Sequence, residues 1–490
     1  MAEKTNQPAE SKDKKDEKTR RLLGIEPVET QHEIIIGDQK LSYTARSGAI
    51  PLKDEFDETE AEIFFTAYDL DLRQGEDRAN RPLVFVFNGG PGSSSVWLHM
   101  GALGPKRVCM QKQGWMPPPP YRYEDNKHTW LDQADLVFID PVGTGFSRAA
   151  KEELDKKFWS FQGDLKSVGE FIRLYLTRYE RWTSPLFLAG ESYGTTRAAG
   201  LAGYLVDLGI TFNGIFLIST VLDFGAIHFM DANDLPYQLF VPTYAATAWF
   251  HNKLDHDLQK RPLSELIAEV EAWSEGELTL ALMKGDRLGS DERRAVAETL
   301  ARYTGLGREY VLGSNLRIEI HRFCKELLRE SRRSVGRLDS RFKGVEAVSV
   351  NERPEFDPSM LAITPPYTAA FNQYVRSELG VKTDLVYETL SVQVNEKWEW
   401  ENGTLPATGE ALRRAIAKNP FMKVLFGQGT YDLATPQFAT QYMIAHMNID
   451  PEFRGNVRFN TYEAGHMFYL DEESLAAFKS DVDTFISVSV

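Results

Sequence analysis

The chain has 490 residues, of which 42% are hydrophobic and 26% charged, and its formal net charge is −15. A globular composition at this length predicts a large domain with a substantial insertion, or two domains. An acidic surface argues against nucleic acid or an anionic membrane as the main partner. The two cysteines, Cys109 and Cys324, exclude a framework of several disulfides.

The first residues are typical of a disordered arm. Residues 1–21 (MAEKTNQPAESKDKKDEKTRR) are rich in Lys, Glu, Asp and Pro and lack the apolar segment of a secretory signal. We therefore predict a disordered N-terminal arm over residues 1–24. The chain as given favours a cytoplasmic protein, whereas a trimmed signal peptide would make it periplasmic or secreted. No run of 18 apolar residues occurs, so we expect no membrane span.

The next segments predict strands of two kinds. A hairpin turning at Gly37-Asp38, followed by AEIFFTAYDL (61–70), is typical of an antiparallel meander. Short apolar runs then alternate with a helical pattern between Gln162 and Trp182. Such runs are typical of strands buried on both faces, and the alternation predicts a mostly parallel α/β sheet. The runs are RPLVFVFNGG (81–90), ADLVFIDPVG (134–143), PLFLAG (185–190) and NGIFLIST (213–220).

The alternation stops near residue 222. Residues 222–354 are rich in helix formers and charge, which predicts a helical cap insertion over one end of the sheet. The strand pattern resumes with FMKVLFGQGTYD (421–432) and VRFNTYEAGHM (457–467), and a helix follows. We thus assign residues 25–221 and 355–490 to the core.

A candidate nucleophile stands in the motif GESYG (190–194). G-x-S-x-G occurs by chance in long chains, but here it follows a predicted buried strand and precedes a predicted helix. That context is what a nucleophile elbow requires, so Ser192 is the predicted nucleophile.

A serine nucleophile needs a base and an acid that orients the base, and in α/β-hydrolases they follow in the order Ser, Asp, His. His466 follows the last predicted strand on a turn preceded by Gly, whereas His446 lies in a predicted helix. We predict His466 as the base. Asp432, on the loop after the preceding strand, is the predicted acid, although a helix cap or turn is its ordinary alternative.

The developing oxyanion needs two N–H donors. The residue after the nucleophile, Tyr193, supplies one, and the loop NGGPGSSS (88–95) supplies the other, which we assign to Gly90. A Gly-rich loop also occurs as a simple turn or as a phosphate cradle. The phosphate alternative is disfavoured because the loop lacks a lysine and the P-loop pattern.

Five motifs, in this order, resemble those of the serine carboxypeptidase family, and of its bacterial branch most of all: NGGPGSSS, FIDPVGTGFS (138–147), GESYG, GQGTYD (427–432) and EAGHM (463–467). The resemblance implies an α/β-hydrolase fold with a helical cap, and release of one residue at a time from the C-terminus of a peptide. It also implies that Asn88 and Glu191 bind the terminal carboxylate of the substrate.

Glu191 and the terminal carboxylate of the substrate can hydrogen-bond to each other only if one of the two is protonated. A carboxylate site built in this way therefore favours acidic pH. The family usually places a second Glu 14 positions after the Asn, where this chain has Ala102. We therefore expect weaker carboxylate recognition or a less acidic pH optimum than is usual in the family.

An esterase or acyltransferase with the same triad is the alternative function. We expect no cofactor and no metal, since HNKLDHD, with His251, Asp255 and His256, lies in a charged helical segment. The expected partner is a peptide with a free C-terminus.

Overall fold

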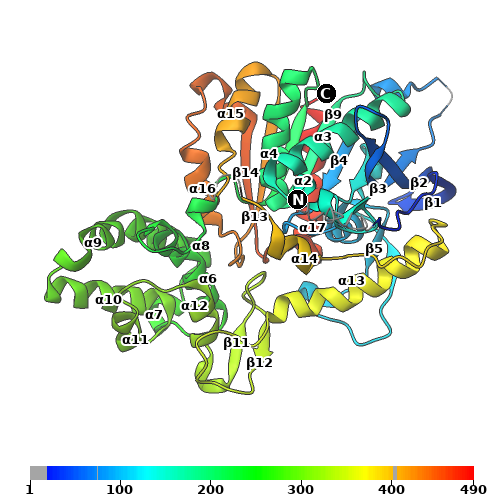
Figure 1. The fold of residues 1–490 in the computed structure, drawn as a ribbon. Coiled ribbons are helices and arrows are strands. Elements are labelled where there is room, and N and C mark those ends of the chain that lie inside the picture. The colour runs from blue at the N-terminus through cyan, green and yellow to red at the C-terminus, as the bar shows by residue number, and fades with distance from the viewer. Residues whose placement is uncertain (1–18, 74, 401–404) are drawn as a thin grey trace, which may run out of the picture.

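One ten-stranded sheet runs through the computed structural model, which describes residues 19–73, 75–400 and 405–490 (Figure 1). Its order is β1–β2–β3–β7–β4–β9–β10–β13–β14, with β8 paired to β3. The strands are β1 (Val28–Ile36), β2 (Gln39–Lys53), β3 (Thr59–Leu70), β4 (Leu83–Phe87), β7 (Asp135–Ile139), β8 (Arg148–Ala149), β9 (Leu186–Ser192), β10 (Gly214–Thr220), β13 (Lys423–Gly429) and β14 (Val457–Tyr462).

The strands divide into an antiparallel and a parallel part. β1, β2 and β3 form an antiparallel meander that turns at Gly37 and Asp38, and β3 pairs antiparallel with β7. From β7 to β14 all neighbouring strands are parallel. This confirms the predicted meander and the mostly parallel sheet. The carboxyl ends of parallel strands meet at one edge, where the loops after β4, β9, β13 and β14 come together.

Helices cover both faces of the sheet (Figure 1). Near the sheet they are α1 (Val96–Leu98), α2 (Asp155–Phe158), α3 (Phe161–Arg178), α4 (Tyr193–Leu205), α13 (Pro358–Ser377), α14 (Val392–Lys397), α15 (Gly409–Lys418), α16 (Gln437–Ala445) and α17 (Glu472–Ser487). A short π-helix spans His99–Leu103, and β5 (Lys106–Val108) pairs with β6 (Tyr123–Asp125).

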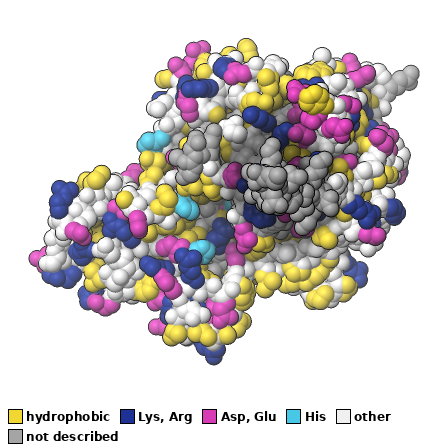
Figure 2. Space-filling view, in the orientation of Figure 1, with side chains coloured by type: hydrophobic (Ala, Val, Ile, Leu, Met, Phe, Trp, Pro, Cys, Tyr) yellow, Lys and Arg dark blue, Asp and Glu magenta, His cyan; other side chains and the backbone are white. Residues whose placement is uncertain are grey.

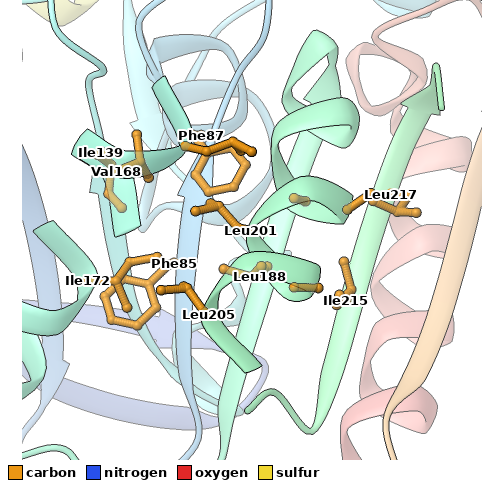
Figure 3. Close-up of a cluster of buried hydrophobic side chains, with 14 of the residues drawn as sticks. Phe85, Phe87, Ile139, Val168, Ile172, Leu188, Leu201, Leu205, Ile215 and Leu217 are labelled. Atoms are coloured by element: carbon orange, nitrogen blue, oxygen red, sulfur yellow. The ribbon is translucent and has the colours of Figure 1, made fainter. Parts of the chain in front are cut away.

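Alternate residues of the parallel strands pack into two separate cores. In β4, Phe85 and Phe87 belong to the core under α3 and α4, whereas Val84 and Val86 belong to the core with α13 and α17. The strand is therefore apolar throughout because both of its faces are buried. Figure 3 shows strand side chains meeting those of α3 and α4 in the first core: Phe85, Phe87, Ile139, Val168, Ile172, Leu188, Leu201, Leu205, Ile215 and Leu217.

Between β10 and α13 the chain forms a separate helical lobe, at the lower left of Figure 1. The lobe has its own cluster of buried apolar side chains. On the face shown in Figure 2, acidic and basic side chains are interspersed over it. The domain boundaries at 222 and 354 stay a prediction. The elements of this segment are α5 (Leu235–Leu239), α6 (Val241–Phe250), α7 (His256–Gln259), α8 (Leu263–Trp273), α9 (Thr279–Lys284), α10 (Ser290–Thr304), α11 (Arg308–Gly313), α12 (Ile320–Glu326), β11 (Arg333–Val335) and β12 (Lys343–Val345).

The predicted N-terminal arm lies mostly outside the described residues, since the description begins at Thr19. Thr19 forms a β-bridge with Lys151, Arg20 forms an ion pair with Asp155, and Leu23 is buried. These residues of the predicted arm thus contact the folded core. Among the described residues, no helix combines the length and the apolar character that a membrane span requires.

Candidate active site

Ser192 lies on a sharp turn between β9 and α4. Its backbone angles, φ 59° and ψ −130°, fall in a region that a residue with a side chain rarely adopts. The glycines on either side make this turn possible. A Cβ on Gly190 would lie 2.2 Å from the carbonyl oxygen of Gly194, and one on Gly194 would lie 3.0 Å from that of Asn88. The turn thus has the form of a nucleophile elbow, as the sequence predicts.

The imidazole of His466 is held by Asp432. His466 Nδ1 lies 2.7 Å from Asp432 Oδ2. Asp432 is fully buried, and its Oδ1 accepts backbone N–H bonds from Ala434 (2.7 Å) and Thr435 (3.0 Å). Because an ionised carboxylate only accepts, Nδ1 carries the hydrogen, and Nε2 keeps its lone pair. His466 and Ser192 line the same cavity.

The charge state of His466 reflects opposing effects. Burial disfavours the imidazolium, but the carboxylate of Asp432 and the nearby Glu191 favour it, so the pKa of His466 is raised above its usual value. Because ionised Glu191 contributes to this rise, protonation of Glu191 lowers the pKa of His466. The two groups therefore titrate as a coupled pair.

Two backbone N–H groups are candidates for oxyanion binding. Tyr193 is the first residue of α4, so its N–H has no acceptor within the helix. Gly90 follows β4 on the Gly-rich loop, and both residues line the cavity. The loop packs directly on the helix start, since a Cβ on Gly89 would lie 2.4 Å from Tyr193 N. The side chain of Tyr193 is anchored elsewhere, with its hydroxyl donating to Asp164 Oδ2 at 3.0 Å.

The predicted carboxylate site is a buried hydrogen-bonded cluster. Asn88 Nδ2 donates to Glu191 Oε2 at 3.0 Å, and the Tyr469 hydroxyl donates to the same oxygen at 2.6 Å. Asn88 Oδ1 accepts the backbone N–H of Leu98, which fixes the orientation of the amide. Both donors bind Oε2 of Glu191. Since Glu191 lines the cavity, its Oε1 is left to bind a ligand.

Burial also decides the charge of Glu191. It raises the pKa of Glu191 to about 7, although the positive charge of His466 and the hydrogen bonds from Tyr469 and Asn88 oppose the rise. Below about pH 7 the carboxyl group is therefore protonated and able to donate a hydrogen bond to a carboxylate ligand.

The cavity has a volume of about 340 Å³, which suits a small ligand or the end of a chain. Leu390 and Val392 are exposed, at 36% and 63%, and so is Asn395. About half of the other lining side chains are apolar: Trp97, Val221, Phe224, Ile227, Leu338, Met360, Ile363, Ala434 and Met467.

Two features near the catalytic residues lie beyond the sequence interpretation. Tyr469 donates a hydrogen bond to Glu191, and Ala102, where the resemblance leads one to expect a second Glu, is buried in the π-helix. Arg337, from the segment between β11 and β12, lines the cavity as well. No cluster of three or more His, Cys, Asp and Glu suited to a metal is found in the described parts of the chain, and His251 Nε2 donates to the carbonyl oxygen of Ser340.

A family model for serine carboxypeptidases matches residues 38–215. This part of the chain is therefore similar to serine carboxypeptidases. The chain is 34% identical over 160 residues to the pheromone-processing carboxypeptidase KEX1 of Saccharomyces cerevisiae, covering 30% of this chain and 20% of that protein. It is 29% identical over 140 residues to serine carboxypeptidase-like 5 of Arabidopsis thaliana, covering 28% of this chain and 30% of that protein. The chain thus spans a fifth to a third of the length of these curated relatives.

The crystal structure of KEX1(delta)p, a prohormone-processing carboxypeptidase from Saccharomyces cerevisiae, is similar to this chain over most of its length. The TM-score is 0.57 at 19% identity, covering 90% of this chain and 91% of that chain. The likeness confirms the predicted α/β-hydrolase fold. The expected likeness to the bacterial branch of the family stays a prediction.

Proposed function

We propose that this protein is a serine carboxypeptidase that releases single amino acids from the C-terminus of peptides. One observation carries the proposal. A buried His466–Asp432 hydrogen bond opens onto the same cavity as Ser192, and Glu191, the residue before the serine, presents a protonatable carboxyl group there.

The chemistry begins at the serine. His466 Nε2 takes the proton of the Ser192 hydroxyl as the oxygen attacks the carbonyl carbon of the last peptide bond. The N–H groups of Gly90 and Tyr193 stabilise the negative oxygen of the tetrahedral intermediate. The imidazolium then protonates the leaving nitrogen, and the terminal amino acid departs. Water, activated by the same imidazole, hydrolyses the acyl group from Ser192.

The carboxylate site sets where the chain is cut. Protonated Glu191 donates to the terminal carboxylate of the peptide, and the Asn88 amide supplies a second donor. Because Glu191 adjoins Ser192 in the chain, a carboxylate bound there places the last peptide bond, and no other, beside the serine. An endopeptidase would have no need of such a buried carboxyl group.

The proposal is tested with an N-blocked dipeptide and its C-terminal amide. We expect release of the terminal amino acid from the free acid and much slower cleavage of the amide. Rapid cleavage of simple esters with no release of amino acid from any dipeptide would instead favour the esterase or acyltransferase alternative.

The pH dependence of this reaction follows from Glu191 and His466. The active form holds one proton on this pair, on Glu191, with His466 neutral. We expect kcat/KM for a free-acid peptide to fall at low pH as His466 is protonated and to fall above about pH 7 as Glu191 ionises. The control is an N-blocked amino acid ethyl ester, which lacks the carboxylate that Glu191 binds. Its kcat/KM should still fall at low pH, as His466 is protonated, but should not fall above about pH 7. A free-acid profile that has already fallen to nothing at neutral pH would contradict the assignment.

Tyr469→Phe tests the cluster around Glu191. Loss of one hydrogen bond of about 1 kcal/mol is expected to raise KM for a free-acid peptide about five- to tenfold, with kcat nearly unchanged. Because the tyrosine stabilises ionised Glu191, its loss also moves the alkaline limb to higher pH. Tyr462→Phe, which loses a similar bond to Asp481, is the matched control. If both variants give the wild-type profile, Tyr469 has no part in binding.

A further inference from the structure

Arg337 brings a positive charge to the wall of the active-site cavity. Among the described residues that line the cavity it is the only lysine or arginine, and about half of its neighbours there are apolar. The side chain is half-buried. No carboxylate partner for its guanidinium is found in the described parts of the chain, whereas nearby Arg341 is paired with Asp339 at 2.7 Å. A guanidinium on a residue that lines the cavity, with no ion pair of its own among the described residues, is suited to bind a carboxylate of a ligand.

The backbone holds Arg337 in a fixed place relative to the catalytic residues. Its N–H donates to Asp357 Oδ1 at 3.2 Å, and its carbonyl oxygen accepts the N–H of Leu433, the residue after Asp432, at 3.0 Å. The carbonyl oxygen of the next residue, Leu338, accepts the N–H of His466 at 2.6 Å. Residues 337 and 338 thus connect the loop that carries Asp432 to the loop that carries His466. The charge of Arg337 is also close enough to act against protonation of His466.

The charges in the cavity favour an anionic substrate side chain. In the active form Glu191 is protonated and neutral, and Asp432 is fully buried behind His466. The terminal carboxylate of the peptide is accounted for by Asn88 and Glu191. The guanidinium of Arg337 is left for a second carboxylate, and it would repel a lysine or arginine side chain.

We propose that Arg337 is a specificity residue that binds the side-chain carboxylate of an aspartate or glutamate next to the scissile bond. This inference rests on the proposed carboxypeptidase function and names its preferred substrates, which are peptides with an acidic residue at the last or the penultimate position.

The test uses pairs of N-blocked dipeptides that differ only in charge. Phe-Glu is compared with Phe-Gln for the last position, and Glu-Phe with Gln-Phe for the penultimate one, at about pH 5.5, where the side-chain carboxylate is ionised. We expect kcat/KM of wild type to favour the Glu peptide about 10- to 100-fold in one of the two pairs. Arg337→Gln should bring that ratio to about 1. Arg337→Lys should keep part of the preference, and Arg317→Gln, in the helical lobe, all of it.

The ratios are taken within one enzyme, so a loss of folded protein does not affect them. An unchanged ratio in Arg337→Gln, or no Glu preference in either pair for wild type, overturns the inference. Equal loss on the Glu and Gln peptides also overturns it, because Arg337 would then serve the terminal carboxylate or the fold. The proposed function itself fails only if wild type releases no amino acid from any of the four peptides.

Discussion

Replacing Ser192 by alanine is expected to lower kcat for release of a C-terminal amino acid by about 10⁵- to 10⁶-fold, with little change in KM. The variant removes the proposed nucleophile and leaves the cavity, the Gly90 and Tyr193 amides and the carboxylate site in place. Without the hydroxyl no acyl-enzyme forms, and only the small rate supplied by binding and the oxyanion donors remains.

The measurement is the rate of amino acid release from an N-blocked dipeptide, followed by chromatography to low turnover. Ser167→Ala is the matched control, because Ser167 is a buried serine on α3 whose hydroxyl donates to a backbone carbonyl outside the cavity. If Ser192→Ala kept more than about 1% of wild-type activity, a nucleophile other than Ser192 would have to be sought.

Asp432→Asn should cost about 10⁴-fold in kcat while leaving the fold intact. The contacts of Asp432 explain why. Its Oδ1 accepts the N–H groups of Ala434 and Thr435, so an asparagine keeps its carbonyl oxygen there and turns its NH₂ group toward His466 Nδ1. Nδ1 must then accept, the ring hydrogen moves to Nε2, and the imidazole no longer accepts the proton of Ser192.

The same dipeptide assay measures this loss, with the melting temperature as the check on folding. Thr435→Val serves as the comparison, since it removes one hydroxyl donor to Asp432 Oδ2 without reversing the imidazole tautomer. It should cost about tenfold or less. An Asp432→Asn variant within about tenfold of wild type would mean that the buried carboxylate does not orient the base.

The sequence supplied candidates for those parts of the proposed site that have a local signature. Ser192 stands in a strand–turn–helix pattern, and His466 and Asp432 each follow an apolar strand, so parallel pairing alone brings the three to one sheet edge. The Gly-rich loop was recognisable because it follows an early apolar strand, and the structure gives a reason for one of its glycines, since a Cβ on Gly89 would clash with the start of α4.

The other residues of the site, Tyr469 and Arg337, depend on long-range contacts that no local sequence pattern reveals. Tyr469 reaches Glu191 from 278 positions along the chain, and nothing in EAGHMFYL distinguishes this tyrosine from a packing residue. Arg337 lies in the segment predicted as a helical cap, where charged residues are common. Its place in the cavity follows from backbone bonds to Leu433 and Asp357 and from the bond between Leu338 and His466. The sequence showed that Ala102 departs from the family pattern, but it did not show the hydrogen bond from Tyr469 to Glu191.

The most direct test of the account is to trap the acyl-enzyme. A suitable substrate is an N-blocked amino acid esterified to a 2-hydroxy acid, because it keeps the terminal carboxylate, and its ester bond acylates faster than an amide. Rapid-quench mass spectrometry should show one N-blocked acyl group on the peptide that contains Ser192, formed together with one equivalent of hydroxy acid. Release of the hydroxy acid with no acyl group on Ser192, or with the acyl group on another residue, would contradict the account.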